Sequence, residues 1–104
     1  MRLDKRLSIL KPVYTDNGSG GQDVEYIEDG TLLANVKELE PTSASVRGKE
    51  VKIAKYEAVA RKQEMRADWR LVYETHVLEV EYIGNIGGDP PFYLKISCRE
   101  ARNA

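Results

Sequence analysis

The chain has 104 residues, of which 41% are hydrophobic and 32% are charged, and its formal net charge at pH 7 is −1. This length supports one modest hydrophobic core, so we expect a single domain over residues 1–104, and the small net charge excludes a global attraction to nucleic acid or to an anionic membrane. The single cysteine excludes an internal disulfide, and no segment approaches the roughly 20 apolar residues of a membrane-spanning helix.

The first strand is predicted in "RLSILKPVY", where Leu7 and Ile9 alternate onto one side and Pro12 marks an edge or an end. Residues 15–30 follow as a polar, glycine-rich segment with little to bury, which predicts a flexible loop. The segment "TLLANVKEL" then predicts a second strand by the same alternation. Its inward side chains are expected to be Leu32, Ala34 and Val36.

The middle of the chain, residues 42–67, gives a weaker signal. Good helix formers are frequent there, but no apolar stripe recurs at helical spacing. We therefore predict a flexible loop over residues 42–55 that has room for one short helix. The segment "YEAVAR" predicts a further strand, whose inward side chains are Tyr56, Ala58 and Ala60.

Three more strands are predicted in "WRLVYE", "VLEVEY" and "FYLKISCRE", with Trp69 in the core as the largest apolar side chain. Glycines and prolines over residues 84–91 predict the mobile tip of a hairpin between the last two strands. The inward side chains of this hairpin are expected to be Leu78, Val80, Tyr82, Phe92, Leu94, Ile96 and Cys98. The pattern as a whole indicates a mainly β fold, a small antiparallel barrel or sandwich of about six strands with long loops.

His76 and Cys98 are the only histidine and cysteine, and they form the one candidate for a catalytic pair. A cysteine nucleophile requires a nearby imidazole and a third group that orients it, whereas Cys98 alternates in phase with aliphatic residues and is expected to act as a small hydrophobe. One histidine and one cysteine are too few for a closed zinc site. The glycine-rich "DNGSGG" lacks the residues of a phosphate or calcium loop. We therefore predict no catalytic residue, no metal, no cofactor and no enzymatic activity.

Charge is distributed unevenly along the chain. Residues 47–66 hold seven basic side chains against three glutamates. Residues 15–30 hold acidic side chains and no basic ones, namely Asp16, Asp23, Glu25, Glu28 and Asp29. Such alternation is typical of a solvated surface, and it also suits contacts between copies of one subunit.

The segments "RLDKRLSIL", "LLANVKEL", "SVRGKE", "YEAVAR", "ADWRLVYETHVLEVEYI" and "PFYLKISCRE" follow one another along nearly the whole chain. Their succession resembles the phage head–tail joining proteins of the head-closure or stopper type. In that resemblance, Ala34 and Val36 match the Ala-x-Val strand of the family, Gly48–Glu50 match a Gly-Arg-Glu-type segment, and Arg61 matches the arginine that ends a strand.

The resemblance implies a structural virion protein of a tailed phage or prophage, located at the head–tail connector after assembly in the host cytoplasm. Its copies would form a ring that closes the DNA-filled head and provides the surface to which the tail attaches. The implied partners are further copies of the chain, the portal or adaptor protein and a tail protein, with no membrane.

Within such a ring we expect two charged segments to have different partners. The acidic segment 15–30 would face a protein neighbour. The basic side chains expected to face the channel and to contact packaged DNA non-specifically are Arg47, Lys49, Lys52 and Lys55.

Two other functions stay open on the sequence. One is a tail-terminator or tail-completion protein, which has a similar size and style. The other is a small OB- or SH3-like barrel that binds nucleic acid, which predicts salt-dependent binding of free oligonucleotides by the monomer.

Overall fold

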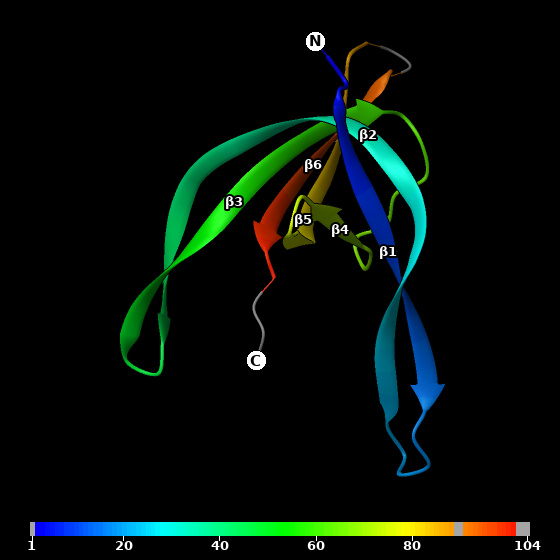
Figure 1. The fold of residues 1–104 in the computed structure, drawn as a ribbon, viewed down its shortest axis with the longest axis vertical. Helices are drawn as coiled ribbons and strands as arrows, with labels where there is room; N and C mark the ends of the chain where they lie inside the picture. Colours follow the sequence, from blue (N-terminus) through cyan, green and yellow to red (C-terminus); the bar gives the residue numbers. More distant parts are fainter. Residues whose placement is uncertain (1, 89–90, 102–104) are drawn as a thin grey trace.

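The computed structural model of the chain describes residues 2–88 and 91–101, and every regular element in these residues is a β-strand. The strands are β1 (Lys5–Asp16), β2 (Gln22–Val46), β3 (Lys49–Arg61), β4 (Arg70–Tyr73), β5 (His76–Ile86) and β6 (Tyr93–Glu100). All neighbours are antiparallel, and the order β1-β2-β3-β6-β5-β4 closes into a barrel (Figure 1). The prediction of a mainly β fold is confirmed. The described part of the chain contains neither the short helix that the sequence allowed nor any helix that could cross a membrane.

The barrel closes because β1 pairs with β4 through Ser8, Ile9 and Leu10. Closure satisfies both edges of the sheet, and the side chains that alternate inward then fill the small lumen. The inward residues predicted for the first, second and third strands all pack in this core or against it. Its fully buried large side chains are Leu7, Leu32, Leu71, Leu78, Ile96 and Cys98.

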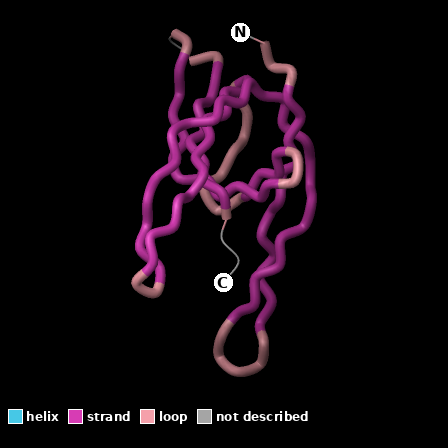
Figure 2. The backbone as a smooth tube through the Cα atoms, turned by 60° about the vertical axis from the view of Figure 1, so that its left-hand side comes forward, coloured by secondary structure: helices cyan, strands magenta, loops and turns pink. Residues whose placement is uncertain are grey.

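Two hairpins extend beyond the barrel as two-stranded arms. The β1–β2 arm comprises residues 11–27 and ends in the turn at 17–21, and the β2–β3 arm comprises residues 42–53 and ends at Arg47–Gly48. Both arms point in the same direction from opposite flanks of the barrel (Figure 1), and only their tips are loops (Figure 2). At the tip of the β2–β3 arm both residues have positive φ, 52° and 77°, as the tight turns that suit hairpins require.

The sequence prediction of loops over residues 15–30 and 42–55 is therefore wrong about the backbone. Only residues 17–21 and the Arg47–Gly48 turn interrupt the strands in these ranges. The arms lack a buried face, so their sequences lack the alternation that reveals a half-buried strand. Backbone pairing across each hairpin supplies the order that burial does not.

Strand β2 belongs to both arms and to the barrel wall between them. A straight strand of 25 residues would span roughly 80 Å, whereas the longest axis of the molecule is 47 Å. The strand therefore bends, as Figure 1 shows. Irregular pairing between Leu39 and Thr42, the usual mark of a β-bulge, lies where the strand leaves the barrel for the β2–β3 arm.

Two side chains of the last hairpin, those of Tyr82 and Phe92, were predicted to point into the core, and both predictions are wrong. Tyr82 is 64% exposed because the pairing slips by one residue between Val80 and Tyr82, which reverses the alternation so that Ile83 packs against the core instead. Phe92 is also 64% exposed, because β6 begins one residue later at Tyr93.

The predicted hairpin tip at residues 84–91 is shorter than expected, because residues 84–86 continue β5. Residues 89 and 90 lie outside the described residues, and so does that part of the prediction. Trp69 is buried in the core, as predicted.

Candidate assembly surfaces

His76 and Cys98 have separate partners in the structure. The His76 Nδ1 atom lies 3.1 Å from Glu100 Oε1 at the half-exposed end of β5, and its ring lies 6.2 Å from that of Tyr56. The Cys98 thiol donates a 3.8 Å hydrogen bond to the carbonyl of Ile96 on its own strand. Cys98 therefore serves as a core residue, in agreement with the sequence prediction.

The environment of Cys98 suppresses thiolate chemistry. Burial raises the pKa of the thiol from 9.0 to about 12, and the carboxylate of Glu81 adds to the rise. A nucleophilic cysteine requires the opposite shift, because the thiolate is the reactive form. No group of three metal-ligating His, Cys, Asp or Glu side chains occurs within residues 2–88 and 91–101 either.

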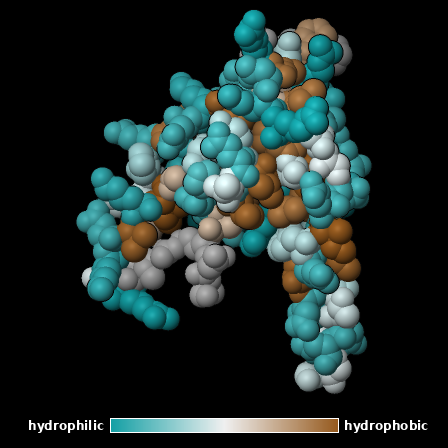
Figure 3. All heavy atoms as spheres, in the orientation of Figure 1, coloured by the Kyte–Doolittle hydropathy of each residue, from teal (hydrophilic) through white to brown (hydrophobic). Residues whose placement is uncertain are grey.

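Apolar side chains lie exposed on both faces of the β1–β2 arm. Tyr14 and Val24 are a cross-strand pair on one face and are 53% and 46% exposed. Val13 and Ile27, on the other face, are 42% and 48% exposed. Figure 3 shows hydrophobic surface on this arm, between the barrel and the more hydrophilic tip. An exposed group of this kind on a projecting element is typical of a protein contact.

The root of the β1–β2 arm is attached to the barrel by side chains. The guanidinium of Arg70 lies 4.2 Å from the centre of the Tyr26 ring. The ammonium of Lys11 lies 4.5 Å from the centre of the Trp69 ring and 3.2 Å from the carboxylate of Asp29. The arm therefore leaves the barrel at a defined angle.

The five acidic residues predicted to face a protein neighbour do not form one patch. Asp29 is paired with Lys11 at the root, and Asp16 accepts a hydrogen bond from the backbone of the terminal turn. Asp23 and Glu25 remain on one exposed face of the arm, next to the apolar Val13. Glu28 lies opposite Leu10 at the root.

The four basic residues predicted to face DNA are also divided. Lys49 and Lys52 differ by an odd number of positions on β3, so they lie on opposite faces of the β2–β3 arm. Arg47 occupies the turn. Lys55 lies at the root, where its ammonium binds the Glu81 carboxylate at 2.8 Å and only 25% of its side chain is exposed. Lys55 is therefore part of the barrel wall.

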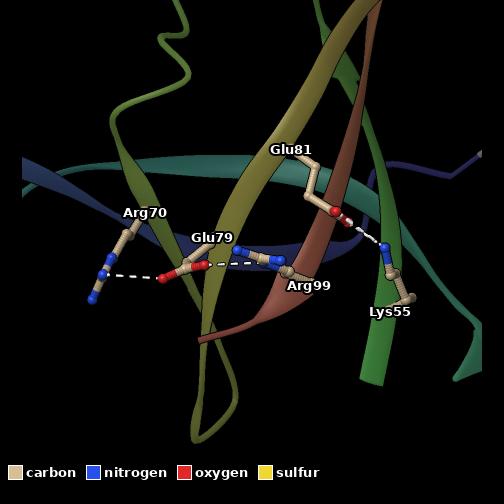
Figure 4. A network of polar contacts seen from close by, with 5 residues as sticks. All are labelled: Lys55, Arg70, Glu79, Glu81 and Arg99. Atoms are coloured by element: carbon tan, nitrogen blue, oxygen red, sulfur yellow. Dashed lines mark hydrogen bonds and ion pairs between the residues drawn. The ribbon is translucent and has the colours of Figure 1, made fainter. Parts of the chain in front are cut away.

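A network of ion pairs crosses the outer wall of the barrel (Figure 4). Glu79 on β5 accepts hydrogen bonds from Arg70 on β4 at 3.2 Å and from Arg99 on β6 at 3.1 Å. Beside it, Lys55 on β3 binds Glu81 on β5. The sequence analysis missed this network, because only the strand order brings these strands together.

Comparisons with known proteins agree with this architecture. The family model described as "Phage head completion protein" matches residues 1–101. Among solved structures, a chain of the "Virion of native gene transfer agent (GTA) particle" superposes with a TM-score of 0.84, covering 97% of both chains at 17% sequence identity. At that identity the likeness establishes the fold. No curated protein sequence matches the chain significantly.

Proposed function

The chain belongs to the phage head completion protein family, which makes it a structural, non-enzymatic component of a virion near the head–tail junction, and from this premise we propose that its copies form a ring there. The ring closes the DNA-filled head and provides the surface to which the tail attaches. Its partners are further copies of the chain, the portal or adaptor protein on the head side and a tail protein on the other.

The placement of the two arms carries this proposal. They lie on opposite flanks of the barrel and point the same way (Figure 1). A rotation about an axis parallel to the arms therefore sets the β1–β2 arm of one copy beside the β2–β3 arm of the next. Such a head-to-tail contact closes into a ring when the rotation divides a full turn.

The chemistry of the arms matches this arrangement. The β1–β2 arm offers Asp23 and Glu25, whereas the β2–β3 arm offers Lys49 and Lys52. Opposite charges steer the encounter and fix its register, and exposed apolar side chains such as Tyr14 supply area to bury.

The β2–β3 arm also carries the proposed contact with packaged DNA. Because Lys49 and Lys52 lie on opposite faces, the arm presents a cation to the neighbouring subunit on one face and a cation to the channel on the other. Arg47 at the tip adds a third cation. Lys55 has no part in this contact, because its ammonium is paired with the carboxylate of Glu81.

A charge swap tests the ring. The double variant Asp23→Lys/Glu25→Lys should lower the amount of the chain found in purified particles about tenfold, which corresponds to roughly 1.4 kcal/mol. Adding Lys49→Glu and Lys52→Glu to the same chain should restore it, because whichever of the two faces the neighbour then has the charge opposite to the new lysines. The control Asp68→Lys reverses an exposed charge outside both arms and should have no effect.

DNA retention is measured in the same particles. In the four-residue swap we expect the chain to be incorporated while the DNA content of the heads stays low. If the four-residue swap does not restore incorporation, the arm-to-arm contact is excluded. If the swap is incorporated and the heads keep their full DNA content, the channel role of the basic residues is excluded.

The place of the ring is tested by electron microscopy of particles made without this chain. Closure of the head predicts complete tails beside tailless, partly emptied heads. Heads joined to misshapen tails would indicate a tail-completion protein instead. Normal particles would favour a nucleic-acid-binding function.

A further inference from the structure

Strand β3 ends and strand β6 begins at the end of the barrel opposite to the arms (Figure 1). An open groove crosses the outer wall of the barrel there. Two adjoining hollows share Arg61 and Tyr93 and make the groove continuous. The side chains that line it are Leu3, Thr31, Leu33, Arg61, Lys62, Gln63, Phe92 and Tyr93.

The strand register arranges cationic and apolar side chains in a row that begins outside the groove lining, at Arg6, and continues through the groove. Arg6 on β1 is the cross-strand partner of Leu33 on β2, and Arg61 on β3 is the partner of Tyr93 on β6. Because Leu33 and Arg61 line the same hollow, the row runs from cation to aliphatic to cation to aromatic. This alternation gives the groove a defined chemical pattern.

The described charged side chains of the groove are of one sign. Among residues 2–88 and 91–101, no aspartate or glutamate lines it. Within the described chain, no carboxylate forms an ion pair with Arg61 or Lys62, and the hydrogen-bond partner of Lys62 Nζ is the neutral side chain of Asn85, at 2.8 Å. The groove therefore complements a carboxylate.

Large apolar surface is exposed in the same place. Leu33 is 50% exposed and Phe92 is 64% exposed. We propose that this groove binds an extended acidic segment of another virion protein, in which an apolar side chain packs on Leu33 and Tyr93 and neighbouring carboxylates pair with Arg61 and Lys62. Arginine suits this role, because its guanidinium binds a carboxylate through two hydrogen bonds.

The groove fits a peptide better than it fits the other two candidates. DNA phosphates would pair with the cations but leave Leu3 and Leu33 exposed. The acidic arm of a second copy has suitable chemistry, but copies joined from arm to groove would stack end to end and form a filament. This inference depends on family membership and not on the ring, so the charge swap described above can fail while the groove is still occupied.

Site-specific photo-crosslinking in assembled particles tests the proposal. The photoreactive amino acid p-benzoylphenylalanine replaces Phe92 in the groove, or Tyr82 as the control, since both residues are 64% exposed and only the first lines the groove. We expect Phe92→p-benzoylphenylalanine to crosslink to a different virion protein, at a peptide with Asp or Glu beside an apolar residue. Leu33 is the second probe position if the first variant does not enter particles.

A charge reversal completes the test. In the photoreactive background, Arg61→Glu should lower the crosslink yield at least tenfold, whereas Arg66→Glu, an exposed arginine outside the groove, should leave it unchanged. Crosslinks to DNA or to another copy of the chain, an equal product from the Tyr82 control, no crosslink from either groove position, or indifference to Arg61→Glu would each overturn the proposal.

Discussion

In the barrel, alternate residues of every strand are removed from water, whereas both faces of the strands in the arms are exposed. The barrel buries Leu78 and Ile96 completely, and no buried side-chain nitrogen or oxygen in the described residues lacks a hydrogen-bond partner. The arms instead expose Tyr14 and Ile27 by about half. The same strands therefore supply folding stability in one region and contact surface in the other, and substitutions should separate the two.

The largest expected change in the free energy of unfolding comes from a substitution in the barrel core. Ile96→Ala removes a fully buried side chain from the core and should lower the free energy of unfolding by about 2–5 kcal/mol. Ile27→Ala on the β1–β2 arm should change it by less than about 0.5 kcal/mol. Urea denaturation of both variants makes the comparison. Equal losses would mean that the arm folds as part of the core.

The pH dependence of stability sharpens the role of the core. The folded pKa of Cys98 is raised to about 12, so its contribution is complete below pH 9 and is lost as the pH rises from 9 towards 12, because the unfolded chain releases its proton first. Relative to Cys98→Ala, the unfolding free energy should fall by about 1.4 kcal/mol per pH unit in that window. A constant difference between pH 8 and pH 10.5 would contradict burial of the thiol.

Removing an ion pair from the barrel wall should lower the free energy of unfolding by less than the core substitution does. Glu79→Gln weakens the contacts to Arg70 and Arg99, which are partly exposed, and should cost at most about 1 kcal/mol at low salt and less in 1 M salt. The control is Glu64→Gln, which should produce no measurable change, because the Glu64 side chain is 69% exposed and its carboxylate lies 4.0 Å from Arg66. A loss of unfolding free energy that persists at high salt would mean that Glu79 stabilises the fold by packing and not by its charge.

The smallest effect on stability should accompany a large effect on assembly. Tyr14→Ser on the β1–β2 arm should leave the free energy of unfolding within about 0.5 kcal/mol of the wild type and yet reduce incorporation into particles. Tyr82→Ser, which removes an exposed aromatic ring from the barrel wall, should change neither quantity. Normal incorporation of Tyr14→Ser would show that the exposed apolar residues of the arm are not buried on assembly.

The same contrast explains which features the sequence predicts. Alternation identified Leu7, Ala58 and Ile96 as inward residues, because burial of one face imposes a period of two. The arms were predicted as loops because that constraint is absent there. Tyr82 was assigned to the wrong face because the bulge before it depends on pairing with β6, which the local sequence does not record.

The candidate surfaces follow a similar division. The grouping of acidic and basic residues is visible along the chain, but their division between faces depends on register. Alternation along β3 separates Lys49 from Lys52, and the strand order brings Lys55 to Glu81. The groove requires Arg61 and Leu33 to be neighbours, and this contact across strands has no signature in either segment.

Strand β2 runs from the tip of one arm, through the barrel wall, to the tip of the other. Arg70 on Tyr26 and Lys11 on Trp69 attach the root of the first arm to the barrel, and the ion pair of Lys55 with Glu81 attaches the root of the second. A pull on either tip is thus transmitted along one covalent strand, without an intervening loop to absorb it. In mechanical terms each subunit is a lever whose two arms share one continuous strand as their link.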